Sequence, residues 1–244
     1  MVSTADLSTG LPDLAAWDPI AGRLTGTVDS ATPETMILPL RSGRIVVMAV
    51  PRPLPLDTVT NDLGQRVVWP GCDQARAGWA SHIIVGSLHE VSDLAHARDT
   101  AEDVVRVAQA LVYAIPVEAV SWDGSGLFVQ ATDFMRMAET SPHPPELLIR
   151  CQWWPTEASV PNALTVGTRG LCFFGLPELH DVTHDPDANA VRSRLLNLCS
   201  FLIANGPIIR DGATIGVDDN RGIQIRHGAD ANGRPVLFVQ TYKK

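Results

Sequence analysis

An amphipathic helix expected over residues 94–115 is the feature that most constrains the fold. Apolar residues recur there at steps of three and four, which places them in one stripe along a helix. They are Leu94, Ala97, Ala101, Val104, Val105, Ala108, Leu111, Val112 and Ile115. Pro116 ends the pattern, because proline cannot continue a helix. A stripe of this kind has to be buried against another layer of secondary structure.

Apolar runs of strand length on both sides of the helix predict that this layer is a sheet. Residues 36–50 form two apolar runs joined by a glycine-containing turn, which indicates a hairpin. Residues 82–88 (HIIVGSL) form a continuous apolar run, typical of a strand buried on both faces. Residues 117–122 predict a further strand, and residues 131–139 a short amphipathic segment.

The same order of elements recurs in the second part of the chain. Strands are predicted at 146–154 and 163–175, and a second helical stripe follows at about 188–204. Its apolar positions are Ala188, Val191, Leu195, Leu198, Cys199 and Leu202. The pieces TIGVDD, GIQIRH and RPVLFVQTY predict the closing strands.

This repeated order predicts an α+β protein. We expect two similar strand–strand–helix–strand halves, about 36–140 and 146–244, in one domain of mostly antiparallel sheet with helices packed on one face. Residues 1–35 are rich in Ser, Thr, Pro, Gly and Asp. They predict an irregular N-terminal arm that packs through Trp17.

Composition limits the classes of partner. The 244 residues carry 19 Lys and Arg against 27 Asp and Glu, a net charge of -8. Nucleic acid and anionic membranes would be repelled by this charge, so neither is expected as a partner. The first 22 residues contain no basic residue and no long apolar core, which argues against a secretory signal. The four cysteines form no C-x-x-C pair and are expected to be reduced, so we predict a cytoplasmic protein.

One polar stretch, residues 173–187, raises the question of a metal site, because it contains two histidines, three aspartates and a glutamate. If the chain is extended there, Glu178 and His180 share a strand face. With His184 they would make the two-histidine, one-carboxylate set that hydrolytic zinc or non-haem iron uses.

The alternative for this stretch is structural. Glu178 then belongs to the folding motif, and residues 180–187 lead into the second helix with Asp185 or Asp187 as its N-cap. The stretch contains no H-E-x-x-H or H-x-H core, and the chain contains no nucleophile or phosphate-loop motif. We therefore predict no catalytic residue, no cofactor and no tightly bound metal.

The tandem Trp153-Trp154 predicts a binding surface. On a strand the two rings point to opposite faces, so one is expected in the core and the other at the surface, where tryptophan often contributes to binding. The sequence does not tell which ring is exposed, and the alternative is that the N-terminal arm covers both; Trp154 is our first candidate. The predicted binding residues are Trp154, Glu157, Asp181, Asp185, Asp218 and Asp219.

Several segments resemble the domain of unknown function 4261 family of bacterial proteins. They are PRPLP (51–55), WP (69–70), WASHIIVGSL (79–88), the helix that ends near Ala114, TVGTRGLCFFGLPELHDV (165–182) and RDGATIGV (210–217). The resemblance extends from about residue 44 to residue 240, and the piece from Thr168 to Leu179 is its most specific part. No catalytic residue is established for the family, so none is transferred to this chain.

The resemblance implies a setting, since members are associated with polymorphic-toxin and type VI secretion loci. Acidic proteins encoded beside a toxin often act as immunity proteins. We therefore expect a protein-binding module, most specifically an immunity protein that neutralises a cognate toxin. The alternatives are a metal-dependent hydrolase using Glu178, His180 and His184, and a structural partner of a secretion apparatus.

Overall fold

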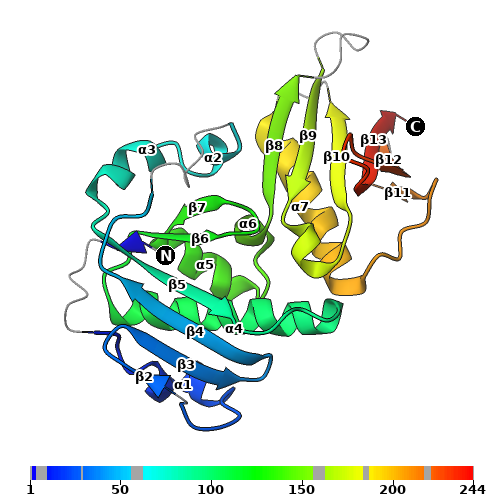
Figure 1. Cartoon of the computed structure of the whole chain (residues 1–244). Coiled ribbons are helices and arrows are strands. Elements are labelled where there is room, and N and C mark those ends of the chain that lie inside the picture. The colour runs from blue at the N-terminus through cyan, green and yellow to red at the C-terminus, as the bar shows by residue number, and fades with distance from the viewer. Residues whose placement is uncertain are drawn as a thin grey trace.

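The computed structural model describes residues 2–3, 10–28, 30–55, 63–155, 163–183, 187–216 and 221–243, and Figure 1 shows its two sheets. The N-terminal sheet has the strand order β2-β3-β4-β5-β1-β6-β7, with every pair antiparallel. Its strands are β1 (Val2–Ser3), β2 (Ser30–Ala31), β3 (Thr35–Leu40), β4 (Gly43–Val50), β5 (Ser81–Ser87), β6 (Ala119–Trp122) and β7 (Leu127–Gln130). The predicted hairpin over 36–50 is therefore confirmed as β3 and β4.

The strand predicted at 82–88 forms, but not with both faces buried. In β5 the side chain of Ile83 is buried, whereas that of Ile84 is 44% exposed. Met48 of the neighbouring strand β4 is exposed as well. An apolar run alone did not distinguish this half-exposed antiparallel strand from a fully buried one.

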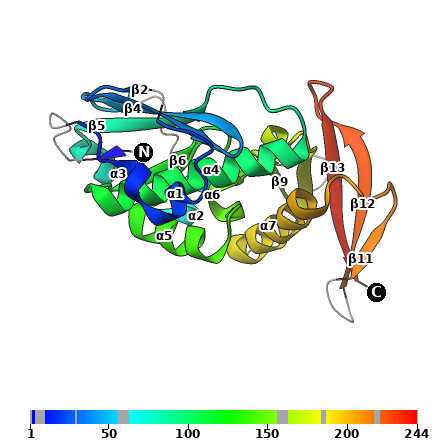
Figure 2. The ribbon, with the colours of Figure 1, turned by 90° about the horizontal axis from the view of Figure 1, so that it is seen from below.

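Helix α4 (Leu94–Ala114) confirms the predicted amphipathic helix and lies along one face of the N-terminal sheet (Figure 2). Asp93 caps it, because its carboxylate accepts a hydrogen bond from the amide of His96 at 2.9 Å. The helix ends at Ala114, and Ile115 is its C-cap directly before Pro116. Its buried side chains serve two apolar clusters, with Ala101 and Val105 in the larger one and Leu111 in the other.

The first 35 residues contain more regular structure than the predicted irregular arm. Strand β1 is inserted between β5 and β6 in the sheet. The 3-10 helix η2 (Leu14–Ala16) and helix α1 (Asp18–Ala21) follow. Leu14 and Ile20 are fully buried against β3 and β4, and Trp17 packs against the same cluster, as predicted.

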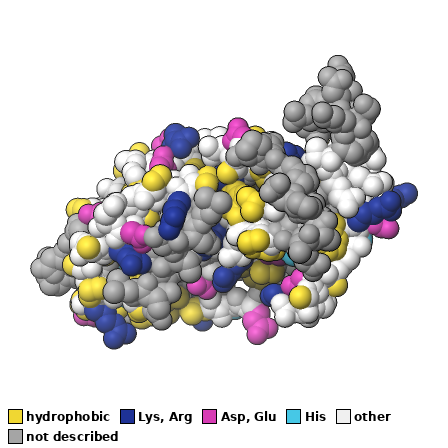
Figure 3. Space-filling model, turned by 90° about the horizontal axis from the view of Figure 1, so that it is seen from above, with side chains coloured by type: hydrophobic (Ala, Val, Ile, Leu, Met, Phe, Trp, Pro, Cys, Tyr) yellow, Lys and Arg dark blue, Asp and Glu magenta, His cyan; other side chains and the backbone are white. Residues whose placement is uncertain are grey.

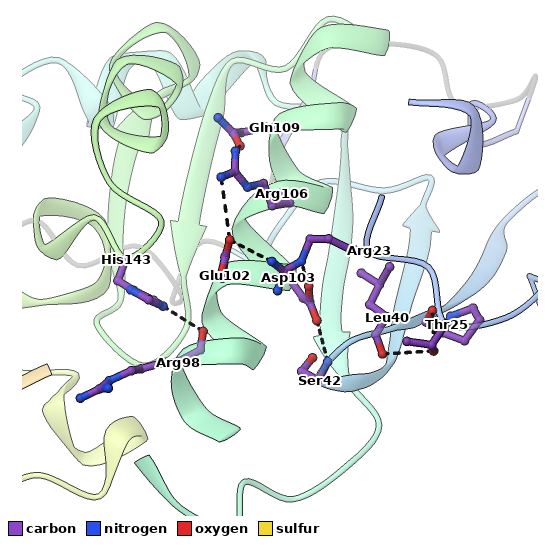
Figure 4. Close-up of polar contacts among 11 residues, drawn as sticks. Arg23, Thr25, Leu40, Ser42, Arg98, Glu102, Asp103, Arg106, Gln109 and His143 are labelled. Carbon is purple, nitrogen blue, oxygen red and sulfur yellow. Dashed lines mark hydrogen bonds and ion pairs between the residues drawn. The ribbon is translucent and has the colours of Figure 1, made fainter. Parts of the chain in front are cut away.

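Buried charges also fasten this arm to α4, as Figure 4 shows. Arg23 pairs with Glu102 through Nη1 at 2.9 Å, and its Nε donates to the carboxylate of Asp103. Asp103 is completely buried, and its second oxygen accepts a hydrogen bond from the amide of Ser42 at 2.8 Å. One carboxylate thus joins the arm, the β3–β4 turn and α4.

The region between β4 and β5 contains short helices. These are α2 (Leu63–Val68), α3 (Cys72–Ala75) and the 3-10 helix η4 (Arg76–Gly78). Gln65 of α2 covers the edge strand β7, because its side-chain amide both donates to the carbonyl and accepts from the amide of Phe128. This pairing satisfies backbone groups that an edge strand would otherwise leave open.

The C-terminal sheet has the strand order β11-β12-β13-β10-β9-β8, in which only the β10–β13 pair is parallel. Its strands are β8 (Arg150–Pro155), β9 (Leu164–Arg169), β10 (Glu178–Thr183), β11 (Thr214–Gly216), β12 (Arg221–Ala229) and β13 (Pro235–Lys243). Two predicted strands are shorter than expected. Helix α6 (Pro145–Leu148) precedes β8, and the 3-10 helix η5 (Leu171–Phe174) follows β9.

Helix α7 (Ala188–Asn205) covers one face of this sheet and confirms the second helical stripe. Asp187 is its N-cap, as one of the two predicted alternatives had it, and accepts hydrogen bonds from Asn189 and Ala190. Arg98 of α4 donates to the carbonyl of Ala204 at 2.6 Å. Because helix ends leave carbonyls without partners, this contact both caps α7 and joins the two sheets' helices.

The α+β class and the mostly antiparallel sheets are confirmed. Each half begins with a three-stranded antiparallel meander, β3-β4-β5 or β8-β9-β10, followed by a long helix. The strands after the helix differ, because β1 separates β5 from β6, whereas β13 pairs directly with β10. The equivalence of the two halves therefore stays a prediction, which superposition of the meanders with their helices tests. Within the described residues, no helix has the length and apolar character needed to cross a membrane.

Candidate functional site

The face of the C-terminal sheet opposite α7 is the candidate site, and we call it the open face. Leu179, Leu237 and Val239 point into the core that α7 shares. Strand side chains alternate, so His180 and Phe238 between them point the other way. Trp154 lies edge-on to His180, with ring centroids 5.5 Å apart, and His180 lies edge-on to Phe238 at 5.9 Å. We call these three side chains, from β8, β10 and β13, the aromatic row.

Two glycines make room for the row. A β-carbon at Gly167 of β9 would lie 2.4 Å from the ring of Trp154. One at Gly228 of β12 would lie 2.5 Å from the ring of Phe238. Both rings therefore lie directly over the neighbouring strand. The row therefore extends over β8, β9, β10, β13 and β12.

The structure settles which tryptophan of the tandem is exposed. Trp153 packs against the large core cluster, whereas Trp154 keeps 37% of its surface exposed. Val182, on the same face of β10 as His180, is exposed as well. The open face thus offers aromatic and aliphatic surface to solvent, which is the composition that protein interfaces favour at their centres.

The carboxylate of Glu178 is occupied by hydrogen bonds to the backbone and to one hydroxyl. One carboxylate oxygen accepts hydrogen bonds from the amides of Gly170 and Cys172, at 2.9 and 3.1 Å. The other accepts from the hydroxyl of Thr168 at 2.7 Å. Glu178 therefore satisfies the amides at the start of η5, which supports the structural interpretation of this residue over the metal-binding one.

Replacing Glu178 with glutamine is expected to lower the free energy of unfolding by about 1–3 kcal/mol. Glutamine keeps one acceptor oxygen but places an amide group toward either the two backbone amides or the Thr168 hydroxyl. Urea unfolding measures the loss. A chelator should change neither protein, and elemental analysis should find no stoichiometric metal. Zinc, iron or manganese that is lost on His180→Ala would contradict this expectation and favour the hydrolase.

His180 is a neutral member of the row. Burial lowers the pKa of its imidazole, although the charges of Asp230 and Glu178 act in the opposite direction. A lowered pKa means that the folded state prefers the neutral ring, so this contribution to stability is fully present above the pKa of the unfolded chain and is lost as the pH falls through the lower pKa of the folded ring. Among the described residues no group of three or more His, Cys, Asp or Glu is placed to hold a metal ion.

Asp181 is not the exposed binding residue that we predicted. It points to the α7 side of β10, is completely buried, and forms an ion pair with Arg194 of α7 at 2.7 Å. The prediction was wrong because one step along a strand moves a side chain to the other face. The remaining predicted residues, Glu157, His184, Asp185, Asp218 and Asp219, lie outside the described part of the chain.

Sequence reasoning missed Phe238 and Gly228. The alternation in RPVLFVQTY is visible, but it does not say which strand lies beside β13. Only the pairing of His180 with Phe238 in the parallel β10–β13 ladder, and of Arg226 with Phe238 in the β12–β13 ladder, places them in the row.

The cysteines are free, and Cys72, Cys151 and Cys199 are buried. Burial raises the pKa of the Cys151 thiol to about 12 and that of Cys72 to about 11, which disfavours the reactive thiolate. Cys172 is exposed and lies beside Glu178; burial and the Glu178 carboxylate raise the pKa of its thiol, which disfavours the thiolate there as well.

Comparison with known proteins gives one match. Neither a curated protein nor a solved structure matches this chain. The segments between residues 44 and 166 that we assigned to the family are outside the matched range. Residues 167–240, which extend from the second half of β9 into β13 and include η5, β10, α7, β11 and β12, match the model of the family described as domain of unknown function (DUF4261).

Proposed function

We propose that this protein is a protein-binding module that uses the open face of the C-terminal sheet, and that it acts in the cytoplasm as an immunity protein against a cognate bacterial toxin. The observation that carries the proposal is the aromatic row on a sheet face with Trp154 and Val182 exposed. Exposed aromatic side chains seated in a rigid sheet are suited to bind a partner, because little conformational entropy is lost on binding.

Charge supports a basic partner. The chain carries a net charge of -8, and a net charge of this sign accelerates association with a positively charged protein. On the face drawn in Figure 3, the described Lys and Arg side chains are interspersed with Asp and Glu. The negative charge of the whole chain, to which Asp218 and Asp219 contribute, is therefore expected to accelerate association with a basic partner.

The enzyme alternative has less support. Glu178 is engaged by two backbone amides and a hydroxyl, and the neutral His180 lies between two aromatic rings. A role as a structural partner of a secretion apparatus also requires a binding face, so the identity of the bound protein distinguishes it from the immunity role.

The proposal is tested with the product of the neighbouring gene. We expect the purified chain to form a stoichiometric complex with it, and cells that express it to survive only when this chain is present. A complex without protection of the cells would favour the secretion role. No retained protein at any ionic strength would contradict the binding proposal altogether.

Trp154→Ala is expected to weaken this complex by about 30-fold or more, mainly through faster dissociation, because a tryptophan at the centre of an interface often contributes about 2 kcal/mol or more. Ile84→Ala is the matched control, since Ile84 is exposed to a similar extent on the N-terminal sheet. It should leave the complex unchanged. Stopped-flow or surface-based kinetics measures both rates, and equal effects of the two substitutions would exclude the open face.

Replacing both Asp218 and Asp219 with asparagine tests the electrostatic part of the same proposal. The association rate should fall and become less dependent on salt, while the dissociation rate stays nearly constant. A change confined to dissociation would show that these side chains contact the partner directly.

A further inference from the structure

A groove of about 800 Å³ lies on the α7 side of the C-terminal sheet, away from the open face. One wall is a single face of α7, and the other is the connector after the helix together with β11 and β12. Its lining residues include Arg194, Leu198, Phe201, Ile208, Ile209 and Arg210. The volume falls in the range of small-molecule sites, roughly 300–1,000 Å³.

The apolar residues of the groove are buried at its floor and exposed at its rim. Leu198, Ile209 and Ile223 are buried and belong to the core. Phe201 and Ile208 at the rim are exposed, and Ile208 keeps 60% of its surface accessible. Exposed side chains of this size around a concave apolar floor are typical of a ligand site.

The chain direction after α7 creates this shape. The helix ends where the amide of Gly206 donates to the carbonyl of Leu202, and Gly206 has a positive φ of 83°. Pro207 follows and prevents continuation of the helix. The chain therefore turns back beside α7 and brings Ile208 and Ile209 opposite Leu198 and Phe201.

The charged side chains of the lining are both arginines. Arg194 uses Nη2 for its ion pair with Asp181, while its buried Nε has no hydrogen-bond partner in the described part of the chain. Arg210 is exposed at the groove, and its neighbour Asp211 is turned toward the amide of His227. Because Asp181 offsets the charge of Arg194, Arg210 is the cation that the groove offers to a ligand, and no carboxylate lines it among the described residues.

We propose that this groove binds a single-chain amphiphile with an anionic head group. The apolar chain packs on Leu198, Phe201 and Ile208, and the head group binds the guanidinium of Arg210, with the paired Arg194 lining the groove beside it. Guanidinium groups pair with carboxylates and phosphates in a bidentate manner. Asp181 is a positioning residue in this arrangement, because its ion pair fixes Arg194 against the sheet. The proposal is independent of the immunity role, since the open face lies on the opposite side of the sheet.

Calorimetric titration with dodecanoate below its micelle concentration tests the proposal. We expect saturable one-to-one binding, and similar binding of dodecyl phosphate would show that the head group is recognised as an anion of either kind. Preference for only one of them identifies the head group. Binding of dodecyltrimethylammonium with equal affinity would overturn the proposal, because a cationic head group cannot pair with arginine.

Two substitutions at exposed positions locate the ligand. Arg210→Gln should weaken dodecanoate binding by about tenfold, in the range expected for one charge-assisted hydrogen bond. Ile208→Asn should weaken it by about tenfold as well, because a large part of an isoleucine side chain no longer contacts the chain of the ligand.

Arg41→Gln and Ile84→Ala are the matched controls, since both residues are exposed away from the groove. They should leave the affinity unchanged, and circular dichroism should show the same thermal unfolding for all four variants. Unchanged affinity in the Arg210 and Ile208 variants, or the absence of saturable binding, would overturn the groove as the site. Complex formation with the toxin should be the same with and without dodecanoate, which separates this result from the test of the open face.

Discussion

Asp103→Ala is expected to lower the free energy of unfolding by about 3–5 kcal/mol. Its carboxylate is completely buried, binds Arg23 of the N-terminal arm, and accepts a hydrogen bond from the amide of Ser42 at 2.8 Å. Alanine leaves the Ser42 amide without this acceptor and Arg23 with only Glu102 as a charged partner among the described residues. A buried charge that loses its partner is far more costly than the net contribution of the pair, which explains the size of the effect.

The pair formed by Asp133 and Arg136 is the matched control. It also joins an aspartate on a helix to an arginine, at 3.1 Å, but both side chains are well exposed. Asp133→Ala should cost less than about 1 kcal/mol, because water screens the charges. Urea unfolding followed by circular dichroism measures both variants. Equal losses would mean that Asp103 does not hold the arm, and a double-mutant cycle with Arg23→Ala measures the coupling directly.

The sequence predicted the elements whose signals are local. The stripes at 94–115 and 188–204 and the hairpin at 36–50 each depend on residues close together in the chain, and all three form. Strand β1 was not predictable, since two residues carry no periodicity and gain their place only by pairing with β5 and β6. Asp103 was equally hidden, because its partners Arg23 and Ser42 are 80 and 61 positions away in the chain.

The candidate site was likewise predictable only where its signals are local in the sequence. Alternation predicted that Trp153 and Trp154 face opposite sides but not which ring is exposed, and the structural role of Glu178 followed from the absence of a ligand motif. The burial of Asp181 did not, because an assignment of faces in 178–183 requires knowledge of which side α7 covers. Phe238 joins the row only through strand pairing between segments far apart in the chain, as the partner of His180. Register of this kind is a tertiary property, so sequence periodicity alone did not predict the row.

Gly170→Ala is the second substitution with a large expected effect, a loss of about 2–6 kcal/mol in the free energy of unfolding. Gly170 has a φ of 129°, where a side chain is strained. A β-carbon there would lie 2.2 Å from the carbonyl oxygen of Leu148, a backbone atom that no rotamer change can remove. Strain of about 1–3 kcal/mol and overpacking of about 1–3 kcal/mol therefore add. A shift of Gly170 would also disturb the hydrogen bond that its amide donates to the carboxylate of Glu178 at 2.9 Å.

Gly175→Ala separates the two causes. Gly175 ends the same 3-10 helix with a φ of 67°, but a β-carbon there would have no atom of the described residues within 4 Å. Alanine there should cost only the left-handed backbone conformation, about 1–2 kcal/mol. The difference between the two variants in urea unfolding then measures the contact with Leu148. If both variants lose the same free energy of unfolding, the backbone at Leu148 shifts to accommodate the new β-carbon. The turn at Gly170 is then not a rigid support of the aromatic row. If Gly170→Ala weakens partner binding and Gly175→Ala does not, the turn between β9 and β10 is needed to keep Trp154 in contact with His180.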